Sequence, residues 1–475
     1  MIDPLQRRLE QLSTAHVQDP SPDWASRADR LRRLEALLVE DAAAIRAAIN
    51  ADFGGRPSQE TDLLELYPSL SEIRHALRYG RRWMRPQRRL APFPFLPARI
   101  ARVPQPLGVI GIIVPWNYPL NLAIGPLTGA LVAGNRAMLK MSELTPRFGA
   151  LFAERIHHLF GPDEVQVVNG DADIARAFAT LPFDHLLFTG SSAVGTQVMH
   201  AAAEHLTPVT LELGGKSPAL IGPNADLAHA VRRILAGKLV NAGQTCVAPD
   251  YVLLPRAQVS GFIEQAQAAT AQMYPDLAGN DQYTAIIGEG HCRRLLALRD
   301  DAVAAGARAL PLGVDAAIAA APFNGLRLAP TLLLEVTADM AVMREEIFGP
   351  WLPVLPYDDL EQALAYITAR PHPLALYLFE RDRRTLRQML AATRAGGVSV
   401  NDTLYHAAQP DLPFGGVGAS GMGGYHGEYG FRTFSHDKPI FFQTRFTGTT
   451  LLGPPYGRLF QRVMAMLLRA PKSTR

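Results

Sequence analysis

Cysteine is nearly absent from this sequence of 475 residues, which contains only Cys246 and Cys292. Two thiols are too few for a disulfide framework or for a cysteine metal cluster of the usual size, so neither a disulfide-stabilised fold nor a metal site is expected. Such sparing use of cysteine is typical of a reducing compartment. The first residues, MIDPLQRRLE, also lack the apolar stretch of a secretory signal. We therefore expect a cytoplasmic location.

The sequence also lacks a strong charge excess and a long uninterrupted apolar helix. Its formal net charge is +3, too mild a balance to indicate a nucleic-acid partner. Residues 103 to 135 carry no charge, but five prolines interrupt this run, and Asn117 and Asn121 lie within it. We expect a buried strand, a turn and a buried helix there rather than a transmembrane segment.

Lysine is similarly scarce, since only five of the 47 basic residues are lysine. The arginine bias is most simply explained by the base composition of the genome. It draws attention to Lys140 and Lys216, because both lie in stretches that look like motifs. The arginine-rich stretch 74 to 102 is expected to be a solvated helix face followed by an extended, proline-rich segment.

Short apolar runs alternate with helical patterns along most of the chain. A helical pattern covers residues 26 to 49, with Ser26 as the expected N-cap. Strands alternating with helices predict parallel βαβ units in an open sheet. After Gly215 the alternation restarts, which predicts a second α/β domain. The runs that indicate strands of the first domain are GVIGIIV (108 to 114), AMLKM, VQVV, HLLFTG and PVTLEL.

NAGQTCVAPD, residues 241 to 250, places Cys246 among small and polar residues rather than in an apolar run. A lone cysteine is more often an inert buried residue than a nucleophile. Gly243, Gln244 and Thr245 are poor core residues, however, and a reactive thiol requires partial exposure and an electropositive or donor-rich surrounding. Cys246 is therefore a candidate nucleophile.

LELGGKSP, residues 211 to 218, places Glu212 at the end of an apolar strand, directly before a Gly-Gly bend. A carboxylate in this position is either a solvated strand end or a general base held in a cleft. The apolar strand favours the cleft, where partial burial raises the pKa of a glutamate towards neutrality.

Two further loops carry polar groups directly after a predicted strand. PWNYP, residues 115 to 119, holds Asn117 between two prolines, where its amide can donate to a developing oxyanion or satisfy loop carbonyls. HLLFTGSSAVG ends a strand in a turn at Gly190 and Ser191, with Gly195 in the first turn of the next helix. The N–H groups of a helix start suit a pyrophosphate, although the spacing is not GxGxxG and an ordinary strand-to-helix turn also fits.

Taken together and in this order, these stretches resemble the aldehyde dehydrogenase superfamily. Its class 3 branch is similar to this chain at GVGASGMGGYHGEYGFRTFSH, and NAGQTCVAPDYVL further resembles coniferyl aldehyde dehydrogenases. Met141 stands where much of the superfamily has proline, but Lys140 and Glu143 beside it are in place. The 34-residue gap between Glu212 and Cys246 also fits. The matching motifs are PWNYP, KMSE (140 to 143), FTGSSAVG, LELGGKSP, GQTC, EEIFGP (345 to 350) and PFGGVGASGMGGYHG (413 to 427).

The resemblance implies the α/β fold of the aldehyde dehydrogenases, with three parts and a C-terminal tail at residues 446 to 475. It also implies a homodimer built through the small sheet. In the tail, residues 456 to 470 place apolar side chains on one helical face, and we expect this helix to pack on the protein. The three parts are a Rossmann-type NAD-binding domain (1 to 84 and 103 to 211), an α/β catalytic domain (212 to 398) and an oligomerisation sheet (85 to 102 and 399 to 445).

The resemblance also assigns roles. It implies Cys246 as nucleophile, Glu212 as the base for the deacylating water, and Asn117 with the Cys246 N–H as oxyanion donors. A carboxylate at Glu143 would accept from both ribose hydroxyls and repel a 2′-phosphate, which favours NAD, although class 3 relatives often also accept NADP. The residues implied to contact the cofactor are Trp116, Lys140, Glu143, Gly190, Ser191, Gly195, Glu346 and Phe348. Those expected to line the aldehyde pocket are Tyr118, Thr245 and Val247.

The implied activity is NAD(P)-dependent oxidation of aldehydes to carboxylic acids. Coniferyl or other aromatic aldehydes are the expected substrates, and fatty or medium-chain aliphatic aldehydes are the alternative. A cysteine hydrolase could also use Cys246, but no histidine base in a matching context accompanies GQTC. A non-catalytic NAD-binding protein is a third reading, and it has no need of Cys246, Glu212 and Asn117 together.

Overall fold

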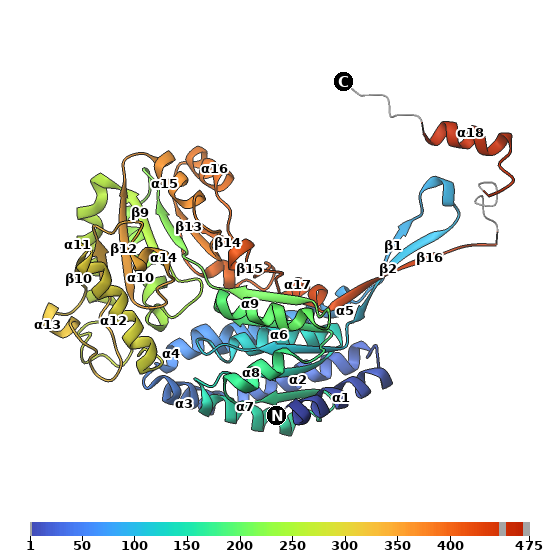
Figure 1. Cartoon of the computed structure of the whole chain (residues 1–475), viewed down its shortest axis with the longest axis horizontal. Coiled ribbons are helices and arrows are strands. Elements are labelled where there is room, and N and C mark those ends of the chain that lie inside the picture. The colour runs from blue at the N-terminus through green and yellow to red at the C-terminus, as the bar shows by residue number, and fades with distance from the viewer. Residues whose placement is uncertain (1, 446–452, 469–475) are drawn as a thin grey trace.

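The computed structural model describes residues 2 to 445 and 453 to 468. It contains sheets of six, seven and three strands, and helices pack against the two larger sheets (Figure 1). Parallel pairing dominates both of these sheets, so the α/β class predicted from the alternating pattern is confirmed. No helix in the described ranges is long and apolar enough to cross a bilayer.

The six-stranded sheet has the order β15-β7-β6-β3-β4-β5, and its edge strand Gly421–Met422 (β15) pairs antiparallel with β7. Its parallel strands are Val109–Ile113 (β3), Arg136–Lys140 (β4), Val165–Val168 (β5), His185–Gly190 (β6) and Val209–Leu213 (β7). One face is covered by Ile2–Gln18 (α1), Ala172–Ala179 (α8) and Ser192–Ala203 (α9). The other is covered by Trp24–Glu40 (α2), Ala42–Phe53 (α3), Tyr67–Trp83 (α5), Asn121–Ala133 (α6) and Pro146–Leu159 (α7).

The uncharged stretch 103 to 135 is explained by its place in these layers. Strand β3 is buried between β4 and β6, and α6 is buried along nearly its whole length. Helix α6 packs against α2, α5 and Gly427–Thr433 (α17), and it ends at Gly134 in a left-handed conformation with φ 96°. A strand and a helix enclosed on every side need no polar face. The expected buried strand, turn and buried helix are confirmed.

The helical pattern at residues 26 to 49 forms two helices, α2 and α3, rather than one. The prediction that Ser26 is the N-cap is wrong. Asp23 is the N-cap, because its carboxylate accepts from the Ser26 N–H at 2.9 Å and also from the Ser26 hydroxyl. An aspartate side chain reaches the N–H three residues ahead as well as serine does, and the apolar pattern does not distinguish the two positions.

The seven-stranded sheet builds the second domain, in the order β10-β11-β12-β9-β8-β13-β14. Residues 214 to 217 connect β7 of the first domain directly to β8 of the second. The strands are Pro218–Ile221 (β8), Tyr251–Pro255 (β9), Arg308–Pro311 (β10), Thr331–Leu334 (β11), Trp351–Tyr357 (β12), Ala375–Phe379 (β13) and Gly397–Val400 (β14). The main helices are Leu227–Leu239 (α10), Val259–Met273 (α11), Glu289–Ala304 (α12), Leu360–Thr368 (α15) and Arg383–Ala392 (α16).

A three-stranded antiparallel sheet projects away from both domains and is called the arm here (Figure 1). It consists of Gln87–Leu90 (β1), Arg99–Pro106 (β2) and Ser435–Phe442 (β16). The boundaries differ from those expected. Of the segment 399 to 445, only β16 lies in the arm, whereas β15 lies in the six-stranded sheet. Strand β2 also continues past residue 102 into the segment expected to begin the first domain.

Helix Arg458–Leu467 (α18) lies beyond the arm, apart from both domains (Figure 1), and has no buried residue. The prediction that this helix packs on the rest of its own chain is therefore wrong. Its amphipathic character is as expected, but it begins at Arg458 rather than at residue 456 and ends at Leu467, and its apolar residues Leu459 and Leu467 are exposed. The expected helix also included Arg469 and Ala470, which lie outside the described residues, as do residues 446 to 452 of the tail.

Candidate active site

A cavity of about 530 Å³ between the two domains brings together Asn117, Glu212 and Cys246. Asn117 lies in the loop after β3, and Glu212 lies near the carboxyl end of β7. Cys246 follows α10 and a short turn, Val240–Gly243. Carboxyl ends of parallel strands are where open α/β sheets commonly bind ligands. The structure thus places all three predicted catalytic side chains at one cavity.

The turn before Cys246 is held in an unusual backbone conformation. Residues 241 to 243 all have left-handed φ values, between 50° and 75°. A Cβ atom at Gly243 would lie 2.2 Å from the carbonyl oxygen of Gly349, so only glycine fits. This close approach fixes the Cys246 turn against the segment that carries Glu346.

The Cys246 side chain is half-buried, and the nearby charged side chains are acidic. Its own N–H and that of Val247 donate towards the sulfur. Burial, followed by the carboxylates of Glu346 and Glu212, raises the pKa of the Cys246 thiol to about 12. The surroundings are therefore donor-rich, as expected, but they are not electropositive. Formation of the thiolate requires a base or an added positive charge.

Glu212 is 2 % exposed, and neither oxygen of its carboxyl group has a hydrogen-bond partner among the described residues. Its backbone is fixed in β7, between Thr189 of β6 and Gly421 of β15. Burial raises the pKa of Glu212 well above its usual range. This burial excludes the alternative of a solvated strand end. An unpartnered carboxyl group at a cavity can accept a proton from a thiol or from water.

The Asn117 side chain is oriented by one hydrogen bond, and its backbone is held by two more. Its Nδ2 donates to the carbonyl of Gln244 at 3.2 Å. Its main-chain carbonyl accepts from Arg56 Nη1 at 3.1 Å and from Asn241 Nδ2 at 3.2 Å. Because a side-chain amide carries two N–H groups, the second one remains available at the cavity wall.

A second cavity of about 600 Å³ continues from the first, since Pro115, Trp116, His291 and residues 189 to 191 line both. Lys140 and Glu143 line only this second cavity, whereas Ser191, the N-cap of α9, lines both. A Cβ at Gly195 would lie 2.6 Å from the Leu213 side chain, so α9 approaches the sheet closely.

The groups along this second cavity fit a dinucleotide. The carboxylate of Glu143 can accept from ribose hydroxyls, and the N–H groups at the start of α9 suit a pyrophosphate. The Thr189 hydroxyl is buried there and has no hydrogen-bond partner in the part of the chain that the structure describes. Lys140 donates to the carbonyls of Met141 and Gly170 at 2.6 and 2.8 Å, and its ammonium lies 4.0 Å from Glu143.

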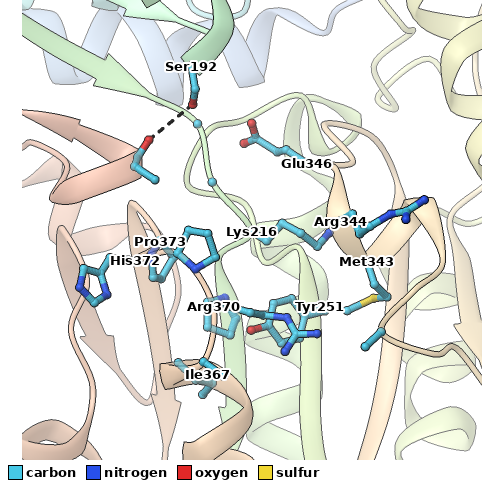
Figure 2. Close-up of a pocket in the computed structure, with 17 residues that line it drawn as sticks. Ser192, Lys216, Tyr251, Met343, Arg344, Glu346, Ile367, Arg370, His372 and Pro373 are labelled. Atoms are coloured by element: carbon cyan, nitrogen blue, oxygen red, sulfur yellow. Dashed lines mark hydrogen bonds between the residues drawn. The ribbon is translucent and has the colours of Figure 1, made fainter. Parts of the chain in front are cut away.

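Glu346 and Phe348 reach the cleft from the second domain. Phe348 has a left-handed φ of 51° and packs edge-to-face on Trp116, with ring centroids 5.4 Å apart. The Glu346 carboxylate lies against Gly214 and accepts from the Gly215 N–H. It also lines an adjoining cavity of about 600 Å³ (Figure 2). Burial, followed by the charge of Asp250, raises the pKa of Glu346 to about 8.

The three residues expected at the aldehyde pocket are buried close to Cys246. The Tyr118 hydroxyl is hydrogen-bonded to the Thr245 hydroxyl, and the Val247 carbonyl accepts from the Tyr377 hydroxyl. None of the three lines the two cavities described above, and the apolar residues that line the first cavity with Cys246 include Leu374 and Phe414. Their role at the aldehyde pocket stays a prediction.

Two residues of α12 line the cavities although no motif indicated them. His291 lies 4.8 Å from Trp116 between ring centroids, and Arg294 donates to the carbonyl of Glu346 at 3.2 Å. They lie one helical turn apart, so they share a face of α12. The three-residue spacing of His291 and Arg294 is the one feature of the sequence that could have indicated them. Many helices that bind nothing have the same spacing.

Comparison with solved structures identifies the class of fold. Staphylococcus aureus AldH in a substrate-bound state matches with a TM-score of 0.91 and 35 % identity, over 98 % of this chain and 99 % of that one. An NADP-dependent enzyme of E. coli matches with a TM-score of 0.85 and 27 % identity, over 93 % and 91 % of the two chains. A Bacillus cereus aldehyde dehydrogenase in complex with NAD⁺ matches with a TM-score of 0.83 and 25 % identity, over 94 % and 89 %. The expected aldehyde dehydrogenase fold is confirmed.

Sequence comparison then identifies the family. Residues 15 to 440 match the aldehyde dehydrogenase family. A probable coniferyl aldehyde dehydrogenase of Pseudomonas aeruginosa is 49 % identical, over 98 % of this chain and 96 % of that protein. The coniferyl aldehyde dehydrogenase of a Pseudomonas species is 44 % identical, over 97 % and 95 %. The chain belongs to the aldehyde dehydrogenase family and is an oxidoreductase that uses NAD(P).

Proposed function

We propose that this enzyme oxidises coniferyl aldehyde and related aromatic aldehydes to carboxylic acids through a covalent intermediate on Cys246. The observation that carries the proposal is the meeting of Cys246, Glu212 and Asn117 at one cavity that continues into a dinucleotide-sized cleft. A hydrolase or a non-catalytic binding protein has no use for this combination.

The first step is addition of the Cys246 thiolate to the aldehyde carbonyl. Because the thiol pKa is raised to about 12, its proton must leave to a base, and the unpartnered carboxyl group of Glu212 can take it when ionised. The carbonyl oxygen becomes an oxyanion, which the Asn117 amide and the Cys246 N–H stabilise. Loss of one such donor typically costs about 3 kcal/mol of transition-state stabilisation.

The thiohemiacetal on Cys246 then collapses to a thioester as its hydride leaves. When bound, NAD(P)⁺ would supply the hydride acceptor and a positive charge. Glu212 first loses the thiol proton to solvent and then takes a proton from water, whose oxygen attacks the thioester. The leaving sulfur recovers that second proton, so the carboxylic acid and the Cys246 thiol are released. The same buried carboxyl group therefore serves in both halves of the cycle.

NAD is proposed as the preferred cofactor. Glu143 lines the dinucleotide cavity 4.0 Å from the Lys140 ammonium, where it can accept from the ribose hydroxyls. A 2′-phosphate at this place would meet the same carboxylate and be repelled. The other residues proposed to contact the cofactor are Trp116, Lys140, Gly190, Ser191, Gly195, Glu346 and Phe348.

The proposed substrate class is supported by the two Pseudomonas relatives, which carry coniferyl aldehyde in their names. The test is the specificity constant for coniferyl aldehyde and benzaldehyde against straight-chain aliphatic aldehydes, measured by formation of reduced nicotinamide. An aliphatic preference of about tenfold, or 1.4 kcal/mol, would replace the proposal by a fatty or medium-chain aldehyde dehydrogenase.

The enzyme is proposed to act as a homodimer, in a reducing compartment such as the cytoplasm. The arm exposes Leu90, Phe93 and Phe442 to solvent in the single chain, and its edge strand β1 is unpaired on one side. A free Cys246 thiol also requires reducing conditions. Light scattering of wild type and of a variant lacking residues 87 to 98 tests the assembly, which should be monomeric in the variant.

A further inference from the structure

Lysine is rare in this chain, and three of the five lysines lie at or behind the cleft. Lys140 and Lys216 line cavities there. Lys238, on α10, is 1 % exposed, and its ammonium has no hydrogen-bond acceptor among the described residues. A buried charge without a hydrogen bond is costly, so its presence next to the cleft needs an explanation.

The nearest opposite charge to Lys238 is the buried carboxylate of Asp250, whose Oδ1 lies 4.0 Å from the ammonium. Asp250 has three further bonds. Its Oδ2 accepts from Lys216, its Oδ1 accepts from the Ile347 N–H at 3.1 Å, and its own N–H donates to Ser217. Asp250 therefore links the two lysines to the backbone next to Glu346.

Lys216 also binds the backbone that leads to Glu346. Its ammonium donates to the carbonyls of Val342 and Glu345 at 2.8 and 2.9 Å. Figure 2 shows Lys216 between Glu346 and Tyr251, with its amino end directed towards the segment that carries Arg344. The segment before Phe348 is thus held by charged side chains rather than by regular secondary structure.

The cluster brings two lysine ammonium groups close to two buried carboxylates. Lys216 and Lys238 carry the positive charges, and Asp250 and Glu346 carry the negative ones. Burial lowers the pKa of Lys238 to about 8 and raises the pKa of Glu346 to about 8. Arg294 adds a further positive charge near Asp250 and Glu346. Because opposite charges favour each other's ionised forms, loss of the Lys238 charge makes Glu346 harder to ionise.

We propose that Lys238 is a positioning residue whose buried ammonium pairs with the Asp250 carboxylate, and thereby holds residues 345 to 348 in place to bind the cofactor. The inference rests on the proposed function, because the cofactor contact of Glu346 is part of that proposal. Lys238 lines none of the three cavities described, so it acts through the two carboxylates. It binds neither the cofactor nor the aldehyde itself.

The test replaces Lys238 by methionine, which has a similar length and no charge. The Kd for NAD⁺, followed by the fluorescence of Trp116 and the other tryptophans, should rise about tenfold at neutral pH. The gain in affinity with rising pH, which follows ionisation of Glu346, should move to higher pH in Lys238→Met. The turnover number at saturating NAD⁺ should change much less than the Kd. Lys438→Met, on the exposed face of β16, is the control and should match wild type.

Lys238→Gln provides a second uncharged variant. An unchanged Kd and pH dependence in a folded Lys238 variant would overturn the proposal. Loss of folding in both variants, seen by circular dichroism, would also overturn it, because the lysine would then serve the fold. Wild type that binds NAD⁺ but oxidises no aldehyde would instead refute the proposed function. The Kd of Lys238→Met for NAD⁺ tests the role of Lys238 without any aldehyde. Failure of this proposal is therefore distinguishable from failure of the proposed function.

Discussion

The backbones of Gly243 and Gly349 approach each other closely, so that the turn before Cys246 lies directly against the segment that carries Glu346 and Phe348. A Cβ added to Gly243 would lie 2.2 Å from the Gly349 oxygen, and the φ of Gly243 is 75°. This contact joins the covalent half of the site to the cofactor half. The position of the Cys246 turn relative to this segment is therefore fixed by contact between two backbones rather than between flexible side chains.

Gly243→Ala should reduce the catalytic activity strongly while the protein still folds. The variant must shift the Cys246 turn and also adopt a strained φ, which together cost about 2 to 3 kcal/mol. We expect a fall of about hundredfold in kcat/KM with a folded protein, since a displacement near the reacting atoms is costly. Gly290→Ala is the control, because a Cβ there meets nothing within 4 Å. Equal activity of the two variants would contradict the role given to this contact.

The reaction rate should rise with pH from neutral to alkaline conditions. Burial raises the pKa of Glu212 well above its usual range, and burial with two nearby carboxylates raises the pKa of Cys246 to about 12. Both groups act in their deprotonated forms, so a higher pH increases the active fraction. Profiles of kcat and kcat/KM against pH provide the measurement. A kcat that falls over this range would be inconsistent with Glu212 as the base.

Much of the site could be predicted from the sequence because its residues follow strands or turns with strong local signals. Glu212 ends an apolar strand before two glycines, and Asn117 is held between two prolines directly after another strand. Cys246 stands out because the chain contains so little cysteine. These signals are local, and the parallel sheet brings the strand ends to one edge.

The rest depends on contacts between segments far apart in the chain. Arg294 and His291 come from an ordinary helix, and only the packing of α12 brings them to the cleft. Lys238 looks like any residue of an amphipathic helix until Asp250 is placed beside it. The sheet to which β15 belongs is likewise set by long-range pairing, which no local pattern in residues 399 to 445 reveals.

Glu143→Gln should improve the use of NADP relative to NAD. The substitution removes the negative charge that would face a 2′-phosphate and keeps an oxygen that can accept from a hydroxyl. We expect the ratio of kcat/KM for NADP to that for NAD to rise by about tenfold, or 1.4 kcal/mol. Glu154→Gln makes the same change on the exposed face of α7 and should leave the ratio unaltered. An unchanged ratio in Glu143→Gln would remove this residue from cofactor selection.

Substitutions of Cys246 and Glu212 should block different steps of the reaction. Cys246→Ala removes the nucleophile, so no thiohemiacetal forms and no reduced nicotinamide should appear. Glu212→Gln is nearly isosteric and leaves the thiol in place, but it removes the base that activates the deacylating water. If another base, such as bulk hydroxide, can take the thiol proton, this variant should give a burst near one equivalent per active subunit and then almost no turnover.

Rapid mixing with absorbance detection measures the burst, and mass spectrometry of the quenched Glu212→Gln protein detects an acyl group on Cys246. Neither burst nor adduct is expected at neutral pH, because Glu212 is the base proposed for the thiol, whose pKa is raised to about 12. The burst should return as the pH is raised, because hydroxide then replaces the missing base. Normal steady-state turnover of Glu212→Gln would remove Glu212 from the mechanism.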